Sequence, residues 1–220
     1  MQNNDANPNT NLSNTSLRQS MLTVLEKSSD KPITVGEIVE ILGAKSFGVL
    51  LVILSLPSAL PVPAPGYSTP FGIAIILIAT QMLYGKQILW LPKKILSLKF
   101  QAQVISKMLK FCISFLGKIE PFIKPRLGLF QGRMGQLAIA VNLILLASLM
   151  VLPIPMTNTL PAMIIFLIAV SLSENDGLMT AIGIFLSYLV VLFYGYLISL
   201  IISQGPGAVD SLFEYISLPR

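Results

Sequence analysis

The chain has 220 residues, of which 54% are hydrophobic and only 11% are charged, and its mean hydropathy is +0.76. Soluble domains carry about 25% charged residues, so this composition excludes an ordinary soluble domain and indicates a membrane protein. The single cysteine excludes an intrachain disulfide, and the absence of histidine removes the commonest general base and metal ligand. We therefore expect no metal, no other cofactor and no enzymatic activity.

Residues 1–45 are polar enough to lie outside the membrane. Residues 1–15 are rich in asparagine and are expected to form a disordered tail. Residues 16–45 are expected to form amphipathic helices at the cytoplasmic surface, the first of them over residues 16–28. The next helix should begin at Thr34-Val35-Gly36-Glu37, because a threonine hydroxyl and a glutamate carboxylate three residues apart form a capping box.

Residues 46–98 and 134–203 contain two copies of one pattern. In each copy a short apolar stretch ends in Leu-Pro-x-Pro, crosses an uncharged loop and becomes apolar again after another proline. The offset between the copies is 92 residues at their first prolines, Pro61 and Pro153, and 90 residues at the apolar runs that follow. Paired hydrophobic segments broken by proline are the best sequence indicator of a membrane translocation site.

The apolar stretches of the first copy, residues 47–60 and 71–83, are short. At 1.5 Å per residue each extends roughly 20 Å, against a hydrocarbon core of about 30 Å. Either flanking residues complete each stretch to a full span, or the pair is a re-entrant hairpin whose tip lies at membrane depth. The uncharged loop favours re-entrance, because backbone at that depth must be buried in protein or line a cavity.

Residues 99–133 are expected to be a basic amphipathic connector. Ten of the fifteen lysines and arginines lie between Lys86 and Arg133, and basic residues beside membrane segments mark the cytoplasmic side. The helical spacing of lysines over residues 99–118 predicts a helix lying on the anionic inner leaflet. If this helix lies flat, both hairpins enter from the same side; if it crosses the membrane, the repeats are inverted.

The end of the chain contains a long apolar segment. Residues 178–202 are uncharged and are the only segment that is plainly long enough to span a membrane alone. Residues 204–220 are expected to form a short tail. No nucleic-acid partner is expected, because the aromatic and polar residues that a nucleic-acid reader interleaves with its basic residues are absent.

The candidate solute site combines the two proline-rich tips with an acidic turn. Proline frees the carbonyl four residues earlier, so the tips expose helix ends that can bind ions or polar groups. Polar side chains in the tips can orient a solute, although they can also cap helices. Acidic residues in membrane segments indicate function, unless they cap the next helix from a surface turn. The candidates are Pro61, Pro63, Tyr67, Ser68, Thr69, Pro153, Pro155, Asn158, Glu174 and Asp176.

Weaker candidates are Gln81, Arg133 and Asn142, each of which can instead make an interhelical hydrogen bond or anchor at the interface.

Several stretches are similar to a known family, the ExoD family of bacterial exopolysaccharide-synthesis membrane proteins. In the first half they are Ile33–Gly43 leading into Ser46-Phe47-Gly48, the ALPVPAPG loop beginning at Ala59, Pro70-Phe71-Gly72, and Gln81–Gly85 with Trp90-Leu91-Pro92. In the second half they are Leu152–Ala162 (LPIPMTNTLPA) and Glu174-Asn175-Asp176-Gly177. The resemblance covers about residues 16–200. It implies a bacterial inner-membrane protein linked to polysaccharide production, without implying a particular molecular activity.

We therefore expect an all-α, multi-pass protein of the bacterial inner membrane, built from two repeats that are each a proline-broken helical hairpin, followed by a long C-terminal transmembrane helix. The leading hypothesis is a transporter or channel-like permeation protein for a small polar or ionic solute. The alternative is a non-transporting scaffold or accessory subunit that holds polysaccharide-synthesis proteins at the membrane. An enzyme acting on a lipid-linked sugar would need Glu174 and Asp176 to face a substrate groove. The expected partners are the lipid bilayer and the solute, and the sequence is compatible with a homo-oligomer.

Overall fold

The computed structural model describes residues 17–28, 32–42, 46–59, 68–86, 89–97, 99–100, 102–119, 124, 130, 132–152 and 158–204. Its helices are α1 (Leu17–Ser28), α2 (Val35–Leu42), α3 (Ser46–Ala59), α4 (Ser68–Leu83), α5 (Lys93–Leu96), α6 (Ala102–Ile119), α7 (Arg133–Val151), α8 (Thr159–Ser173) and α9 (Gly177–Gln204). The all-helical class is confirmed. The expected tail 1–15 and nearly all of the tail 204–220 lie outside the described residues.

The N-terminal helices begin where the sequence predicts. The predicted capping box is present at the start of α2, where the Thr34 N–H and Oγ1 donate to Glu37 Oε2 at 2.7 and 2.8 Å. The Glu37 N–H donates in return to Thr34 Oγ1 at 3.2 Å. The hydrogen bonds from the Thr34 backbone and hydroxyl lower the pKa of Glu37, because they stabilise its ionised form.

A short β ladder, which the sequence did not predict, joins the N-terminal segment to the middle of the chain. Strand β1 (Ile33–Thr34) pairs antiparallel with β2 (Lys99–Phe100). The ladder brings the start of α2 next to the segment that leads into α6.

α6 is amphipathic as predicted, but its apolar face is covered by protein. α6 packs mainly against α1 and also contacts α3. The buried residues on this face are Ile105, Leu109, Cys112 and Leu116. This apolar face is covered by α1 and is not available to lipid, whereas the position of the helix at the inner leaflet stays a prediction. Lys107 and Lys110 remain exposed on the other side of α6.

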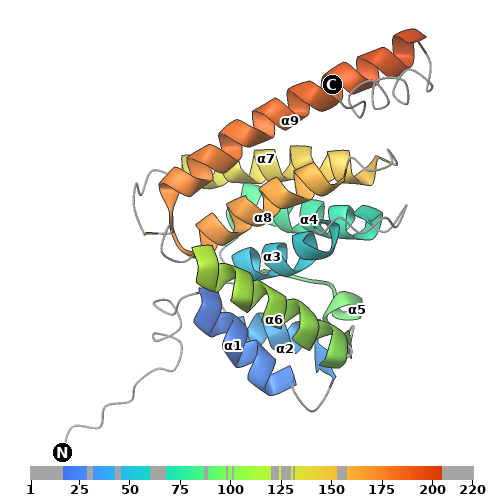
Figure 1. Ribbon diagram of the computed structural model, residues 1–220. Helices are drawn as coiled ribbons and strands as arrows, with labels where there is room; N and C mark the ends of the chain where they lie inside the picture. Colours follow the sequence, from blue (N-terminus) through green and yellow to red (C-terminus); the bar gives the residue numbers. More distant parts are fainter. Residues whose placement is uncertain are drawn as a thin grey trace, which may run out of the picture.

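α3 and α4 form one hairpin, and α7 and α8 form a second. Each of these helices packs most extensively against a helix of the other hairpin. α3 packs most extensively against α8, and α4 against α7 (Figure 1). Gly48 near the start of α3 lies against Ser173 at the end of α8. Gly72 near the start of α4 lies against the Ala147 carbonyl near the end of α7. Both pairs are therefore antiparallel, and the two hairpins point in the same direction.

Two of the described helices are long and apolar enough to cross a membrane, α7 and the part of α9 from Gly177 to Leu200. The long C-terminal helix agrees with the prediction. The prediction that no other segment is long enough is wrong, because α7 begins at Arg133 and its 19 residues extend about 28 Å. α3, α4 and α8 are shorter, with 14, 16 and 15 residues.

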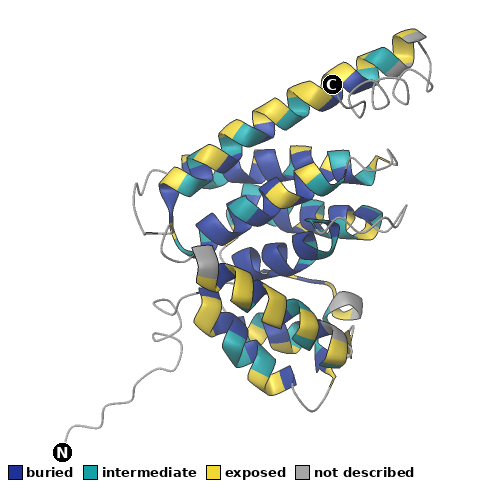
Figure 2. Cartoon of the chain, in the orientation of Figure 1, coloured by how far each residue is buried: buried dark blue, intermediate teal, exposed yellow. Residues whose placement is uncertain are grey.

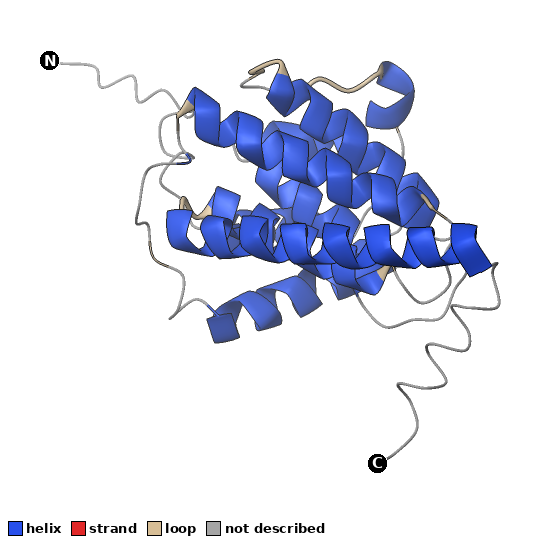
Figure 3. Cartoon of the chain, turned by 90° about the horizontal axis from the view of Figure 1, so that it is seen from above, coloured by secondary structure: helices blue, strands red, loops and turns tan. Residues whose placement is uncertain are grey.

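The helices are stacked in layers, with α9 on one side, the hairpins in the middle, and α6, α1 and α2 on the other side (Figure 1). Buried residues are concentrated in the hairpins, whereas exposed residues follow α9 and the outer sides of α1 and α6 (Figure 2). Seen from above, α9 runs across the helices beneath it (Figure 3). Its exposed residues include Phe185, Leu192 and Tyr196, and a contiguous apolar surface of this kind is typical of contact with lipid or another protein.

Candidate functional site

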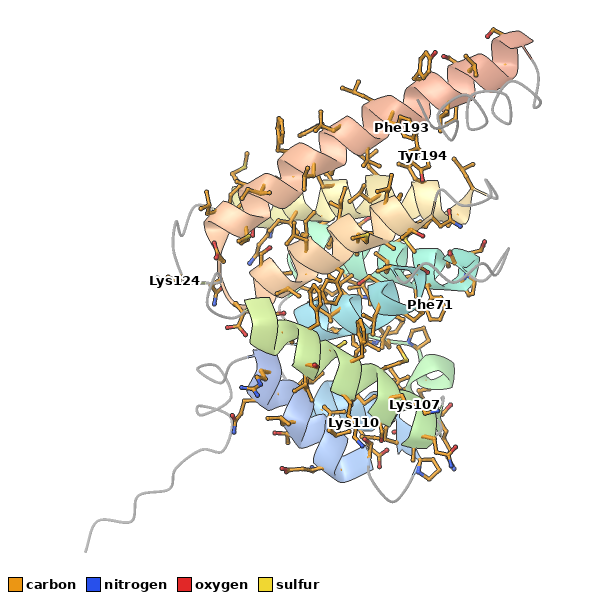
Figure 4. The ribbon with its side chains drawn as sticks, viewed as in Figure 1. Phe71, Lys107, Lys110, Lys124, Phe193 and Tyr194 are labelled. Carbon is orange, nitrogen blue, oxygen red and sulfur yellow. The ribbon has the colours of Figure 1, made fainter. Side chains whose placement is uncertain are left out.

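Asp176 lies at a buried junction between α8 and α9. Its side chain is fully buried, and its Oδ1 accepts hydrogen bonds from the N–H groups of Leu178 and Met179 at 3.0 and 3.1 Å. Asp176 therefore caps α9, where a negative charge is stabilised by the positive end of the helix dipole. Its Oδ2 accepts a hydrogen bond from the N–H of Lys124 at 3.0 Å, a residue labelled in Figure 4. The helix-capping alternative has the predicted partners; the capping side chain of Asp176 is buried, although Asn175 beside it is exposed.

Glu174 connects the same turn to the N-terminal segment. Its Oε1 accepts a hydrogen bond from the N–H of Leu17, the first residue of α1. Between the two acids, Asn175 has φ 56°, a left-handed conformation that asparagine tolerates better than most residues. The two carboxylates thus hold the starts of α1 and α9 together. Any role of these acids toward a solute stays a prediction.

A cavity of about 260 Å³ lies beside the acidic turn, bounded by the start of α7, the end of α8 and the start of α9. Its polar lining comes from Gln136, Ser171, Asn175 and Thr180. The Thr180 hydroxyl lies 3.0 Å from Ser171 Oγ and 2.9 Å from the Asp176 carbonyl oxygen, and can donate to either. The sequence did not predict this cavity; its only signal was that polar residues of apolar helices lie close in sequence to the acidic turn.

The proline-rich tips are described only at their edges. Pro61, Pro63, Tyr67, Pro153 and Pro155 lie outside the described residues, so the predictions for them stay predictions.

The described edges of the tips are the first residues of α4 and α8. Ser68 begins α4 and is 6% exposed, and Thr69 beside it is partly buried. Asn158 precedes α8, but its side chain makes no capping hydrogen bond. Within the described part of the chain, Asn158 Oδ1 is buried without a hydrogen-bond partner, and so is the Oγ of Ser58 in α3. Ser58 is not among the residues predicted from the sequence, although its position directly after Pro57 was a signal.

Ser58 and Asn158 lie at the same end of the bundle. Because α3 and α8 are antiparallel and Gly48 faces Ser173, the last turn of α3 lies toward the first turn of α8. Native proteins pair the large majority of their buried polar atoms. Ser46 Oγ, at the opposite end of α3, is also buried without a partner, but the tip end has two such oxygens, and they provide acceptors for hydrogen atoms of a bound molecule.

Of the weaker candidates, Asn142 makes the predicted interhelical hydrogen bond, whereas Gln81 bonds a residue outside the helices. Asn142 Oδ1 accepts a hydrogen bond from Ser187 Oγ, which joins α7 to α9, and Asn142 Nδ2 donates to the Ala138 carbonyl at 2.8 Å. Gln81 Oε1 accepts a hydrogen bond from the N–H of Trp90 at 2.7 Å. These contacts place both residues in structural roles. Among the described residues, no group of three or more His, Cys, Asp or Glu is arranged to hold a metal ion.

Residues 17–196 match the family model described as "Exopolysaccharide synthesis, ExoD". The chain is 38% identical over 187 residues to an uncharacterized protein of Synechocystis sp., covering 84% of this chain and 88% of the relative. It is 30% identical over 197 residues to Protein ExoD of Rhizobium meliloti, covering 87% of this chain and 81% of the relative. No solved structure matches the chain significantly. The predicted family resemblance is thus confirmed, and the chain belongs to the ExoD family, which is linked to exopolysaccharide synthesis.

Proposed function

We propose that this protein is a multi-pass protein of the bacterial inner membrane that allows a small polar or charged solute to permeate, in support of exopolysaccharide production. The family description supports the link to exopolysaccharide synthesis. The two membrane-length helices, α7 and α9, support the membrane location. The basic residues between Lys86 and Arg133 support an orientation with that segment in the cytoplasm.

One observation carries the proposal of permeation, namely the pair of buried oxygens that lack partners at the tip end of the bundle. Asn158 Oδ1 and Ser58 Oγ have no hydrogen-bond partner among the described residues. An unpaired buried acceptor costs about 1–3 kcal/mol, and a passing solute with N–H or O–H groups would remove this cost. The solute site would therefore lie where the two hairpins turn.

The packing of each helix against a helix of the other hairpin supports two internal repeats. A two-fold rotation that superposes the first hairpin on the second converts the α3–α8 contact into the α7–α4 contact, and both are extensive. The hairpins point in the same direction, so this axis runs along them. α3 and α4 extend only about 21 and 24 Å, which supports a first hairpin that re-enters rather than crosses a hydrocarbon core of about 30 Å. In the second hairpin only α8 is this short, because α7 is long enough to cross.

The proposal includes no catalytic step. The carboxylates of Glu174 and Asp176 accept hydrogen bonds from backbone N–H groups, which supports a structural rather than an acid–base role for them.

Permeation is tested in proteoliposomes that contain the full chain. Osmotic swelling would be followed for a panel of small polyols and salts, and a trapped dye would report proton entry. Wild type should accelerate at least one of them over protein-free vesicles, and Asn158→Ala and a Pro63→Ala, Pro155→Ala double variant should slow that entry. Gln103→Ala, on the exposed side of α6, is the matched control. Wild-type vesicles that behave like empty ones, or tip variants with unchanged flux, would defeat the proposal.

A second candidate function, a scaffold for polysaccharide-synthesis proteins, is favoured by the exposed side of α6. Phe111 and Phe115 are 44% and 40% exposed, and their rings are stacked with centroids 6.4 Å apart, close in sequence to Lys107 and Lys110. Exposed aromatic residues are enriched at protein interfaces, and exposed lysines can steer an acidic partner toward such a surface. If the scaffold function holds, a Lys107→Glu, Lys110→Glu double variant should lose co-purifying synthesis proteins while its solute flux stays unchanged.

A further inference from the structure

The cavity beside the acidic turn has the lining of a site for a neutral ligand. None of the described residues that line it is charged. Gln136 and Asn175 contribute carboxamides, each with donor and acceptor groups, and the structure gives neither side chain a hydrogen-bond partner among the described residues. The cavity therefore offers directional hydrogen bonds without an ionic partner.

The hydroxyl groups in the cavity add further acceptors. Thr180 is 2% exposed, and its single proton is used by Ser171 Oγ or by the Asp176 carbonyl. The Ser171 hydroxyl donates to the Ile168 carbonyl at 2.9 Å. Both oxygens keep lone pairs that can accept a hydrogen bond from a ligand, so the ligand should carry O–H donors.

The remaining lining is apolar. Phe130 and Leu172 face the cavity along with the carboxamides and hydroxyls. A binding site with a few placed polar groups on an apolar wall suits a compact molecule that has a polar rim and an apolar face. A pyranose ring has this shape, with hydroxyl groups around its edge and C–H groups on its face.

We propose that this cavity binds one neutral sugar ring, as a free sugar or as a glycosyl unit. The site is distinct from the proposed permeation site, because Gln136 lies at the start of α7, whereas the proline-rich tip follows its end. The inference goes beyond permeation and does not depend on it. A neutral sugar is chosen over an ion because the nearby carboxylates of Asp176 and Glu174 already hold backbone N–H groups.

The test uses the full-length chain in lipid nanodiscs and saturation-transfer NMR, with methyl β-D-glucopyranoside as the probe and glucuronate as its charged counterpart. Wild type should bind the glycoside saturably and more tightly than glucuronate. Gln136→Met keeps the length of the side chain but removes the amide, and should weaken binding about tenfold, the equivalent of one lost hydrogen bond. Asn175→Gly removes the second amide at a left-handed position that glycine adopts freely, and should also weaken binding.

The control is Gln103→Met, which makes the same change on the exposed side of α6 and should bind like wild type. Melting curves of all variants separate lost binding from lost folding. The proposal is overturned if wild type shows no saturable binding of the glycoside, if Gln136→Met and Asn175→Gly bind as wild type does, or if glucuronate binds more tightly than the neutral sugar.

Discussion

Replacing Gly48 with alanine tests the contact between the two hairpins. A Cβ added at this position would lie 1.9 Å from Ser173 Oγ, 3.1 Å from Ser173 Cβ and 3.3 Å from the Ala169 carbonyl oxygen. Rotation of the Ser173 side chain relieves only the first of these contacts. The other two stay tight, so Gly48→Ala should push α3 away from α8.

The size of the effect follows from two opposed terms. Overpacking a well-packed interface by one methyl group costs about 1–3 kcal/mol. Alanine returns about 0.5–1 kcal/mol through its higher helix propensity. The net loss lies between about 0 and 2.5 kcal/mol and is centred near 1 kcal/mol, which lowers the melting temperature of a chain of this size by about 2–4 °C.

Thermal unfolding of the nanodisc-embedded chain measures this loss. Gly195→Ala in α9 and Gly117→Ala in α6 are matched controls, since an added Cβ at either position meets nothing within 4 Å. Both controls should be neutral or stabilising. The double variant Gly48→Ala, Ser173→Ala should recover part of the loss, because it removes the closest atom. If Gly48→Ala melts at or above the wild-type temperature, the result would contradict the close contact between α3 and α8 at Gly48.

Three further predictions concern single side chains. The folded-state pKa of Glu37 lies below its ordinary 4.5, so its capping box stabilises the protein fully above that pH and less as the pH falls through the folded pKa. Glu37→Gln should therefore weaken the fall in melting temperature as the pH drops below 4.5, and an unchanged slope would contradict the capping box. Burial raises the pKa of Cys112 to about 12, so native protein should react with N-ethylmaleimide much more slowly than unfolded protein, whereas equal rates would mean that α6 does not cover this thiol. Asp176→Ala should cost about 1–2 kcal/mol from the α9 cap alone, and Asp176→Asn less because it keeps an acceptor oxygen; chemical unfolding that ranks the two variants equally would argue against the cap.

Local features of the fold could be predicted from the sequence because their causes are local. The Thr34–Glu37 capping box depends on residues three apart, and the length of α9 follows from an uninterrupted apolar run. The packing of α3 against α8 and of α4 against α7 could not be predicted in this way. It depends on how Gly48 fits against Ser173, two residues far apart in the sequence. The covered face of α6 escaped prediction for a related reason, since an amphipathic pattern does not say whether lipid or protein covers its apolar side.

The candidate site could be predicted only in part. The sequence indicated that Asp176 either caps the next helix or meets a solute, and the capping geometry is present. It gave no indication that Glu174 reaches Leu17, because the two residues are separated by 157 positions. The unpaired Oδ1 of Asn158 also required the structure, since an asparagine before a helix usually caps it.

The most direct test of a solute pathway at the tips is the accessibility of cysteines placed at Ser68 and Asn158 in a Cys112→Ala background. Reaction rates of membrane-embedded protein would be measured with a small charged thiosulfonate and with a bulky polyethylene glycol maleimide, using Gln103→Cys as the exposed reference. A narrow wet site predicts that the small reagent reacts at both tips while the bulky one reacts only at the reference. If the bulky reagent modifies both tips as fast as the reference, the tips lie in open water and the permeation proposal is contradicted.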